Sequence, residues 1–193
     1  MREHPIVTEP EARAISSERI GAFIDGSNLT SATGALGFSV DYRKLLDHFH
    51  ASGRLVQAFY YTTIGAADCL ALRKLAELHG ERGYALVERP AKDEASAHEW
   101  LKCALAVELA LDLIAMLPHL DHAILMSGDG EFCRLIETAQ QRGVRVTVVS
   151  TVRSTPPMIN EALRRQADRF IDLEDLAPVI GGQPAQTSWS ECS

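Results

Sequence analysis

The sequence lacks the features of several protein classes. No apolar run approaches the ~20 residues of a membrane-spanning helix, and residues 1–18 contain no apolar segment typical of a signal peptide. The four cysteines include no CxxC pair, which argues against a zinc site and favours free thiols in a reducing compartment. These absences predict a cytoplasmic protein with no membrane partner.

Basic residues are also in the minority, because the formal net charge is −7. Nucleic-acid-binding proteins are usually basic, so a broad electrostatic grip on phosphates is not expected. Between positions 142 and 169, however, the sequence contains six arginines and only two acidic residues, a local excess of four positive charges. This stretch is either an ordinary solvated surface or a phosphate-contacting patch. The second reading requires that the patch borders the functional site.

The chain has no internal repeat and no linker between domains. Its 193 residues are 46% hydrophobic, enough for one domain with a sizeable core. Polar, proline-containing residues 1–18 read as a flexible leader, and residues 179–193 as a disordered tail. We therefore expect a single domain over residues 19–178.

Strand-like and helix-like segments alternate along this domain, which predicts an α/β fold with a doubly wound, mostly parallel sheet. The predicted strands are 20–24, 55–61, 84–87, 123–126, 144–149 and 170–171, and the predicted helices are 41–50, 66–82, 96–117, 130–142 and 156–166. Strands 20–24, 123–126 and 144–149 are apolar without alternation, so we expect them at the centre, covered on both faces.

Carboxylates follow two of these central strands. Asp25 comes directly after strand 20–24, and Asp129 and Glu131 follow strand 123–126 across a Ser-Gly-Asp-Gly turn. Each Asp alone is most simply a turn residue or a helix cap. Together, at the edge of a parallel sheet where ligands bind, they indicate a site for a hard cation such as Mg²⁺ or Mn²⁺.

Three segments resemble a known family. They are FIDGSNL at 23–29, AILMSGDGEF at 123–132 and ADRFIDL at 167–173, and they are similar to the NYN domain of LabA-like proteins, relatives of PIN-domain ribonucleases. The stretch 143–159 is similar to the bacterial branch of that family. The resemblance implies a Rossmann-like (PIN-like) three-layer sandwich with a central, mostly parallel sheet.

The resemblance also implies a metal-dependent ribonuclease in which carboxylate-bound Mg²⁺ or Mn²⁺ activates water for attack on an RNA phosphodiester. Asp25 and Asp129 match the family's metal ligands, and Glu131 stands where the family usually has Asp. Asn28 and Ser127 match polar residues of the same two motifs, which we expect to contact substrate. Arg153 and Ser154 follow strand 144–149, so they are expected at the same edge, facing phosphate.

One position departs from the family pattern. An Asp usually found on the long helix aligns with Ala106, although Lys102 and Asp112 of that pattern are present. Glu99 lies on the same helix face and is a substitute ligand, whereas Glu108 is 200° away from position 106 and should point elsewhere. We therefore keep an alternative, a catalytically weakened module that binds RNA or a regulatory protein partner, or forms a homo-oligomer.

A third reading is a metal-dependent phosphatase on the same architecture. It lacks a nucleophile motif, because position 27, two residues after Asp25, is Ser rather than a second Asp.

Overall fold

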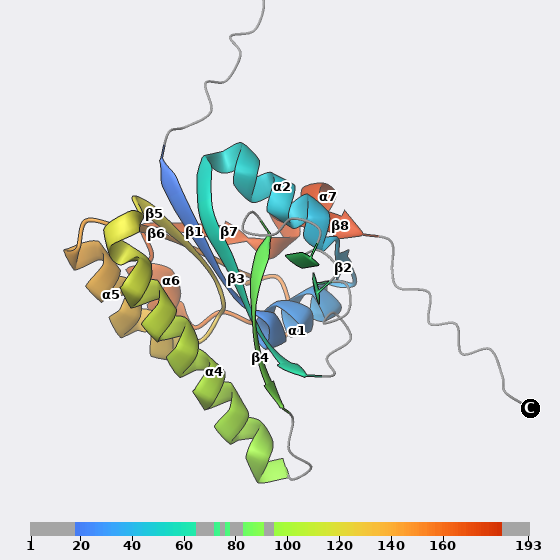
Figure 1. Cartoon of the computed structure of the whole chain (residues 1–193). Coiled ribbons are helices and arrows are strands. Elements are labelled where there is room, and N and C mark those ends of the chain that lie inside the picture. Colours follow the sequence, from blue (N-terminus) through green and yellow to red (C-terminus); the bar gives the residue numbers. More distant parts are fainter. Residues whose placement is uncertain (1–17, 65–71, 74–75, 78–82, 91–94, 183–193) are drawn as a thin grey trace, which may run out of the picture.

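The computed structural model describes residues 18–64, 72–73, 76–77, 83–90 and 95–182. Its centre is a six-stranded sheet in the order β4-β3-β1-β5-β6-β7, and every neighbouring pair is parallel (Figure 1). The strands are β1 Arg19–Asp25, β3 Arg54–Ile64, β4 Tyr84–Pro90, β5 His122–Met126, β6 Arg145–Ser150 and β7 Arg169–Asp172. A short antiparallel pair, β2 Ser39–Val40 and β8 Gly181–Gly182, lies beside it.

Helices cover both faces of the sheet, which gives the three layers visible in Figure 1. One layer holds α1 Gly26–Leu36, α2 Tyr42–Ser52 and α7 Leu173–Ile180. The other holds α4 Ala95–Met116, α5 Cys133–Gln141 and α6 Glu161–Gln166, with the short 3₁₀ helices η2 Leu117–His119 and η3 Gly130–Phe132. The predicted α/β class and single three-layer domain are confirmed.

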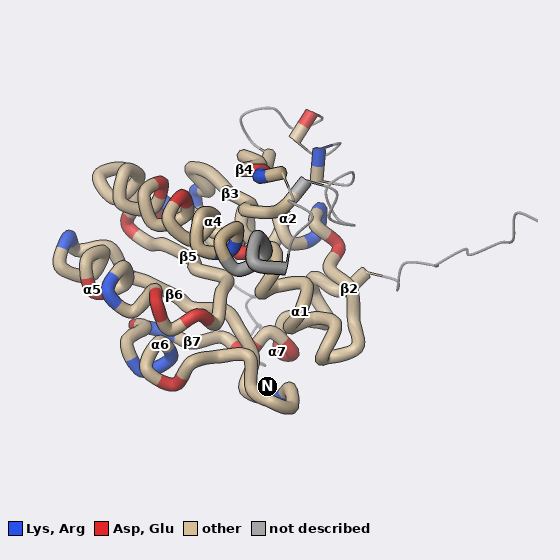
Figure 2. Tube along the Cα trace, turned by 90° about the horizontal axis from the view of Figure 1, so that it is seen from below, with Lys and Arg blue, Asp and Glu red and all other residues tan. Residues whose placement is uncertain are grey.

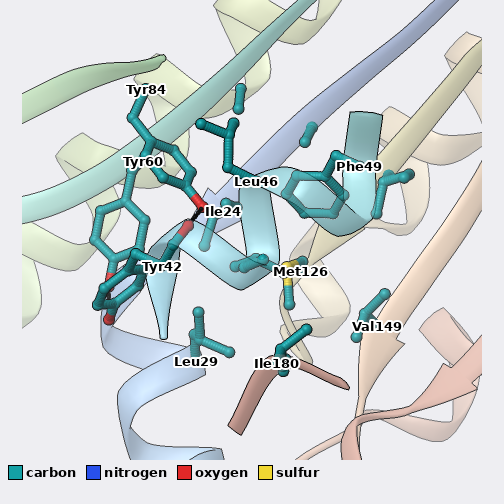
Figure 3. Close-up of a cluster of buried hydrophobic side chains, with 14 of the residues drawn as sticks. Ile24, Leu29, Tyr42, Leu46, Phe49, Tyr60, Tyr84, Met126, Val149 and Ile180 are labelled. Carbon is teal, nitrogen blue, oxygen red and sulfur yellow. Dashed lines mark hydrogen bonds between the residues drawn. The ribbon is translucent and has the colours of Figure 1, made fainter. Parts of the chain in front are cut away.

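The core has two halves because side chains alternate along each strand. In β1, Ile20 and Ile24 pack under α1, α2 and α7, whereas Phe23 points to the α4–α6 side. Figure 3 shows the first half, where the hydroxyl groups of Tyr42 and Tyr60 lie 3.0 Å apart in a hydrogen bond. Burial on both faces explains why β1, β5 and β6 carry unbroken apolar runs.

The predicted strands all correspond to observed ones, and β1, β5 and β6 are interior strands of the sheet as expected. Asp41 caps α2 by accepting hydrogen bonds from the amides of residues 43 and 44, also as predicted. The predicted helix 66–82 falls largely outside the described residues.

Three local predictions were wrong or incomplete. The sequence interpretation assigned no helix to 26–36, where α1 forms, and none to 173–180, where α7 forms. Residues 179–182 are therefore part of α7 and β8 rather than of a tail. The helix predicted from Pro156 begins only at Glu161, because the Asn160 side chain caps it by accepting a hydrogen bond from the Ala162 amide at 2.8 Å.

Within the described residues, no helix has both the length and the apolar character required to cross a bilayer.

Candidate active site

The ends of β1 and β5 place the two predicted motifs side by side. Ile24 is paired with Met126 in parallel register, so Asp25 and Ser127 follow at adjacent positions on the carboxyl edge of the sheet. The Asp25 carboxylate accepts three hydrogen bonds: Oδ1 from the Asn28 amide (3.1 Å) and the Ser27 hydroxyl (2.8 Å), and Oδ2 from the Ser127 hydroxyl (3.1 Å). This carboxylate is therefore fixed in orientation by both motifs.

A second set of hydrogen bonds joins the β5 turn to the same network. The Gly128 amide donates to Asn28 Oδ1 (3.0 Å), and the Asp129 amide donates to Ser127 Oγ (3.3 Å). Asp129 Oδ1 in turn accepts from the Glu131 amide (3.0 Å) and caps η3. Asp25 and Asp129 are thus both helix caps, yet Asp129 Oδ2 has no hydrogen-bond partner among the described residues.

Two glycines allow this close approach of backbone turns. A Cβ on Gly26 would lie 2.5 Å from the Tyr60 ring, and a Cβ on Gly128 would lie 1.7 Å from the Met158 carbonyl oxygen. Gly26 is the first residue of α1 and does not have a positive φ. Gly26 is therefore required for packing, because there is no space for a side chain at this position.

The network opens into a cavity of about 280 Å³ between α1, η3 and α4. The cavity lies at the carboxyl ends of β1 and β5. Figure 2 views the molecule from below, which is the side of these strand ends. Its lining residues include the three predicted carboxylates, one cation and several apolar side chains: Asp25, Ser27, Asn28, Ser31, Tyr61, Lys102, Cys103, Leu105, Ala106, Leu109, Asp129, Glu131, Phe132 and Met158. Among the described residues that line it, three are acidic and one, Lys102, is cationic.

Four of the predicted site residues therefore meet at this cavity, namely Asp25, Asn28, Asp129 and Glu131. Ser127 does not line it. Its side chain is fully buried, and its hydroxyl donates to the Asp25 carboxylate and accepts from the Asp129 backbone amide.

The structure does not bring Arg153 or Ser154 to the cavity. Arg153 forms ion pairs with Glu174 (3.0 Å) and Asp175 (2.6 Å) in the first turn of α7. Ser154 is buried and donates to the Pro156 carbonyl oxygen (2.9 Å). Both residues are occupied in fixing the loop after β6.

The arginine-rich stretch 142–169 does not border the cavity either, because none of its arginines is among the lining residues. Figure 2 shows basic positions on α5 and α6, to one side of the carboxyl edge. Arg164 lies 3.6 Å from Glu161 and its guanidinium lies 5.2 Å from the centre of the Phe170 ring. Of the two readings of this stretch, the structure favours a solvated surface with local ion pairs.

On the far wall, Tyr61 is a buried residue whose hydroxyl donates to Asp112 Oδ2 (2.9 Å). Burial, and then the adjacent Asp112 carboxylate, raise the pKa of Tyr61 far above its ordinary value, so the phenol keeps its proton. Asp112 thus has a structural partner and lies outside the cavity lining, and Glu108 pairs with Arg89 on another side of α4.

Comparison with known proteins agrees with this geometry. The family model described as the NYN domain matches residues 19–174. The chain belongs to the NYN domain family. NYN domains have a PIN-like nuclease fold.

This NYN domain is similar to a named protein and to a solved structure. The low amplitude and bright protein LabA of Synechococcus elongatus is 32% identical over 173 residues, covering 86% of this chain and 90% of LabA. The crystal structure of a Vibrio parahaemolyticus protein of unknown function matches with a TM-score of 0.67 at 24% identity, covering 88% of this chain and 99% of that one. The second likeness supports the fold alone.

The NYN site has oxygen donors suited to a hard cation. Carboxylate oxygens are the ligands that Mg²⁺ and Mn²⁺ prefer, and Mg²⁺ commonly binds through one or two carboxylates while keeping several waters. Among the residues that the structure describes, no three His, Cys, Asp or Glu side chains are close enough to hold an ion by themselves. The donors therefore fit an ion held by one or two carboxylates and completed by water.

Ala106 explains part of this small ligand set. It lines the cavity at the position that aligns with an Asp of the family pattern given above, so the wall presents a methyl group where a fourth carboxylate would stand. The Glu99 side chain, the suggested substitute, lies outside what the structure describes.

Lys102 was identified from the sequence only as part of the family pattern on the long helix, and it was not predicted to belong to the site. It is exposed, lines the cavity and has no ion-pair partner among the described residues. Since Lys102 precedes Ala106 by four residues, one helical turn places both on the same face. That spacing was the signal that could have found it.

Proposed function

We propose that this NYN domain is a metal-dependent ribonuclease that cleaves RNA phosphodiesters. The observation that carries the proposal is the convergence of Asp25, Asp129 and Glu131 on one cavity at the carboxyl edge of a parallel sheet. The family supports the choice of a nuclease over a phosphatase, and Ser27, which donates to Asp25, leaves no second Asp to act as a nucleophile.

Asp25 and Asp129 are the residues that would hold Mg²⁺ or Mn²⁺, and Glu131 would reach the ion through a bound water. When bound, the ion would supply an activated water and stabilise the charge that develops on the phosphate. Asp25 is oriented for this role by its three hydrogen bonds. Asp129 Oδ2 and both Glu131 carboxylate oxygens have no hydrogen-bond partner in the described part of the chain, so they are available to a ligand.

Two further residues suit the RNA phosphate. Asn28 uses its side-chain oxygen to accept from Gly128, which leaves its amide NH₂ directed to donate to a phosphate oxygen. Lys102 places a positive charge on the opposite wall, on α4. Without a cation in the site, three carboxylates against one lysine would repel a phosphodiester, so RNA cleavage should require the divalent ion.

The test is cleavage of single-stranded and structured RNA with Mn²⁺, comparing the wild type with Asp129→Asn. Asn also caps helices, so the variant should fold while losing the carboxylate charge. We expect at least ~100-fold slower cleavage, in the range that follows from disturbing metal-site residues. Asp47→Asn, an exposed Asp on α2 in the other helical layer, is the matched control and should cleave like the wild type.

Cleavage by Asp129→Asn at the wild-type rate would contradict the proposed site. Absence of wild-type cleavage with any divalent metal would contradict the ribonuclease function itself.

The second candidate is an NYN module that binds RNA, or a regulatory protein, with weakened catalysis. The specific observation in its favour is Ala106 at the cavity wall. It predicts metal-dependent RNA binding by the wild type without turnover, measured by fluorescence anisotropy on the same RNAs.

A further inference from the structure

The outward face of α4 is exposed and apolar. Among the described residues, the large hydrophobic side chains with high exposure are Trp100 (58%), Val107 (58%), Leu111 (61%), Ile114 (41%) and Val179 (49%). All but Val179 lie on α4. Clustering on one helix distinguishes this surface from the isolated hydrophobic residues that any protein exposes.

The spacing of these residues places them on one stripe. Trp100, Val107, Leu111 and Ile114 are separated by seven, four and three residues, which keeps them on one side of a helix. We call these four residues the α4 stripe. Leu105, Leu109 and Leu113 lie on the opposite side of α4 and pack in the core. A helix that is apolar on both sides is normally buried on both sides, yet Val107, Leu111 and Ile114 are between 41% and 61% exposed.

Shallow hollows flank the stripe on both sides. One, of about 360 Å³, lies against α5 and shares Cys103, Ala106, Glu131 and Phe132 with the carboxylate cavity. The other, of about 420 Å³, is bordered by the Arg89–Glu108 ion pair. A partner seated on the stripe could fill both hollows with side chains and would reach the rim of the proposed active site.

The stripe is self-complementary about Val107. In an antiparallel helix pair centred on this residue, Trp100 of one copy faces Ile114 of the other, and Leu111 faces the small residue Cys103. Each pair in this register is therefore apolar, and the contact is symmetric about Val107. We propose that the α4 stripe is the interface with a second copy of this chain, in a two-fold symmetric, antiparallel α4–α4 contact.

The available area sets the strength of this contact. The stripe extends over about 22 Å of helix, and the outward half of a helix about 11 Å wide offers roughly 400 Å² over that length. A stable interface buries about 800 Å² per partner. The helix supplies about half, so the flanking hollows must also be filled, and we expect a weak dimer whose population depends on protein concentration.

The test is sedimentation velocity of the full chain over a concentration series, with Val107→Glu as the disrupting variant. Two glutamates would face each other at the two-fold axis, and this like-charge contact should weaken association at least ~100-fold. Val179→Glu is the matched control, because it changes the same residue type at similar exposure on α7, away from the stripe. It should dimerise like the wild type.

A charge-swap experiment tests the register. Val107→Lys alone should also be monomeric, whereas an equimolar mixture of Val107→Glu and Val107→Lys should recover the dimer, because opposite charges then meet at the axis. A wild type that stays monomeric across the series would overturn the proposal and indicate a different partner for the stripe. A Val107→Glu protein that dimerises like the wild type, or a mixture that stays monomeric, would overturn the α4–α4 contact.

Discussion

Restoring a carboxylate at position 106 should strengthen metal binding. Ala106→Asp adds a negative charge to the wall of a cavity of about 280 Å³, and a sphere of that volume has a radius of about 4 Å. A unit charge interacts with another at that distance by about 1 kcal/mol in water, and a divalent ion doubles this to about 2 kcal/mol. The water-like value is the appropriate lower limit, because Asp129 and Glu131 are exposed. The affinity for Mn²⁺ should therefore rise at least ~30-fold.

The assay is isothermal titration of Mn²⁺ into the wild type and Ala106→Asp, followed by RNA cleavage at limiting metal. Ala104→Asp is the matched control, since it makes the same change on the same helix 200° away from position 106, outside the cavity lining. Its Mn²⁺ affinity should match the wild type. Equal gains in the two variants, or no gain in Ala106→Asp, would refute the assignment of position 106 to the metal site.

Two further predictions concern stability. The pKa of His122 is lowered mainly by burial and also by the nearby Arg145. As the pH falls, the unfolded chain therefore takes up a proton at this residue before the folded protein does. The free energy of unfolding should then decrease as the pH drops below about 6.5. Denaturation at about pH 7.5 and 5.5 should show a smaller loss for His122→Gln, and an equal loss would contradict this origin. In urea unfolding, Gly128→Ala should lower the free energy of unfolding by about 3 kcal/mol or more, because its Cβ would clash with the Met158 carbonyl oxygen. Gly34→Ala should raise the free energy of unfolding by about 0.5–1 kcal/mol, because its Cβ would enter open space on a helix. Similar effects of the two alanines would refute the packing argument.

The central position of three strands could be predicted from the sequence because burial on two faces leaves a direct signal. The apolar runs of β1, β5 and β6 contain no alternation, and these strands are interior ones. The helices α1 and α7 gave no comparable signal. α1 begins with Gly-Ser-Asn and contains Thr and a second Gly, residues with weak helix propensity, and it is held by the Asp25 cap and by packing of Leu29 and Ala32.

The carboxylates of the site could be predicted once the central strands were recognised. Residues that follow neighbouring parallel strands lie together at one edge of the sheet. Arg153 and Ser154 also follow a strand, but position alone does not determine the direction of a side chain. The acidic first turn of α7 pairs with Arg153, and no helix was predicted at residues 173–180. Lys102 was overlooked because it reaches the site from a helix whose orientation depends on tertiary packing.

Some predictions from the sequence stay predictions: the cytoplasmic location, the RNA substrate, and the division into a leader, one domain and a tail. Only the predicted boundary at residue 179 changes, because α7 and β8 extend to Gly182. The metal-ligand roles of Asp25, Asp129 and Glu131 are part of the proposal, and so is a homo-oligomer, for which the α4 stripe gives a specific interface.

The central claim is that Asp25 and Asp129 share one divalent ion. Anomalous diffraction from crystals of the protein soaked in Mn²⁺, collected above the manganese absorption edge, tests it most directly. We predict one strong peak inside the cavity, with oxygen atoms of both Asp25 and Asp129 as ligands, and loss of that peak in Asp129→Asn. Manganese bound only elsewhere, in crystals of a protein that cleaves RNA with Mn²⁺, would contradict the account.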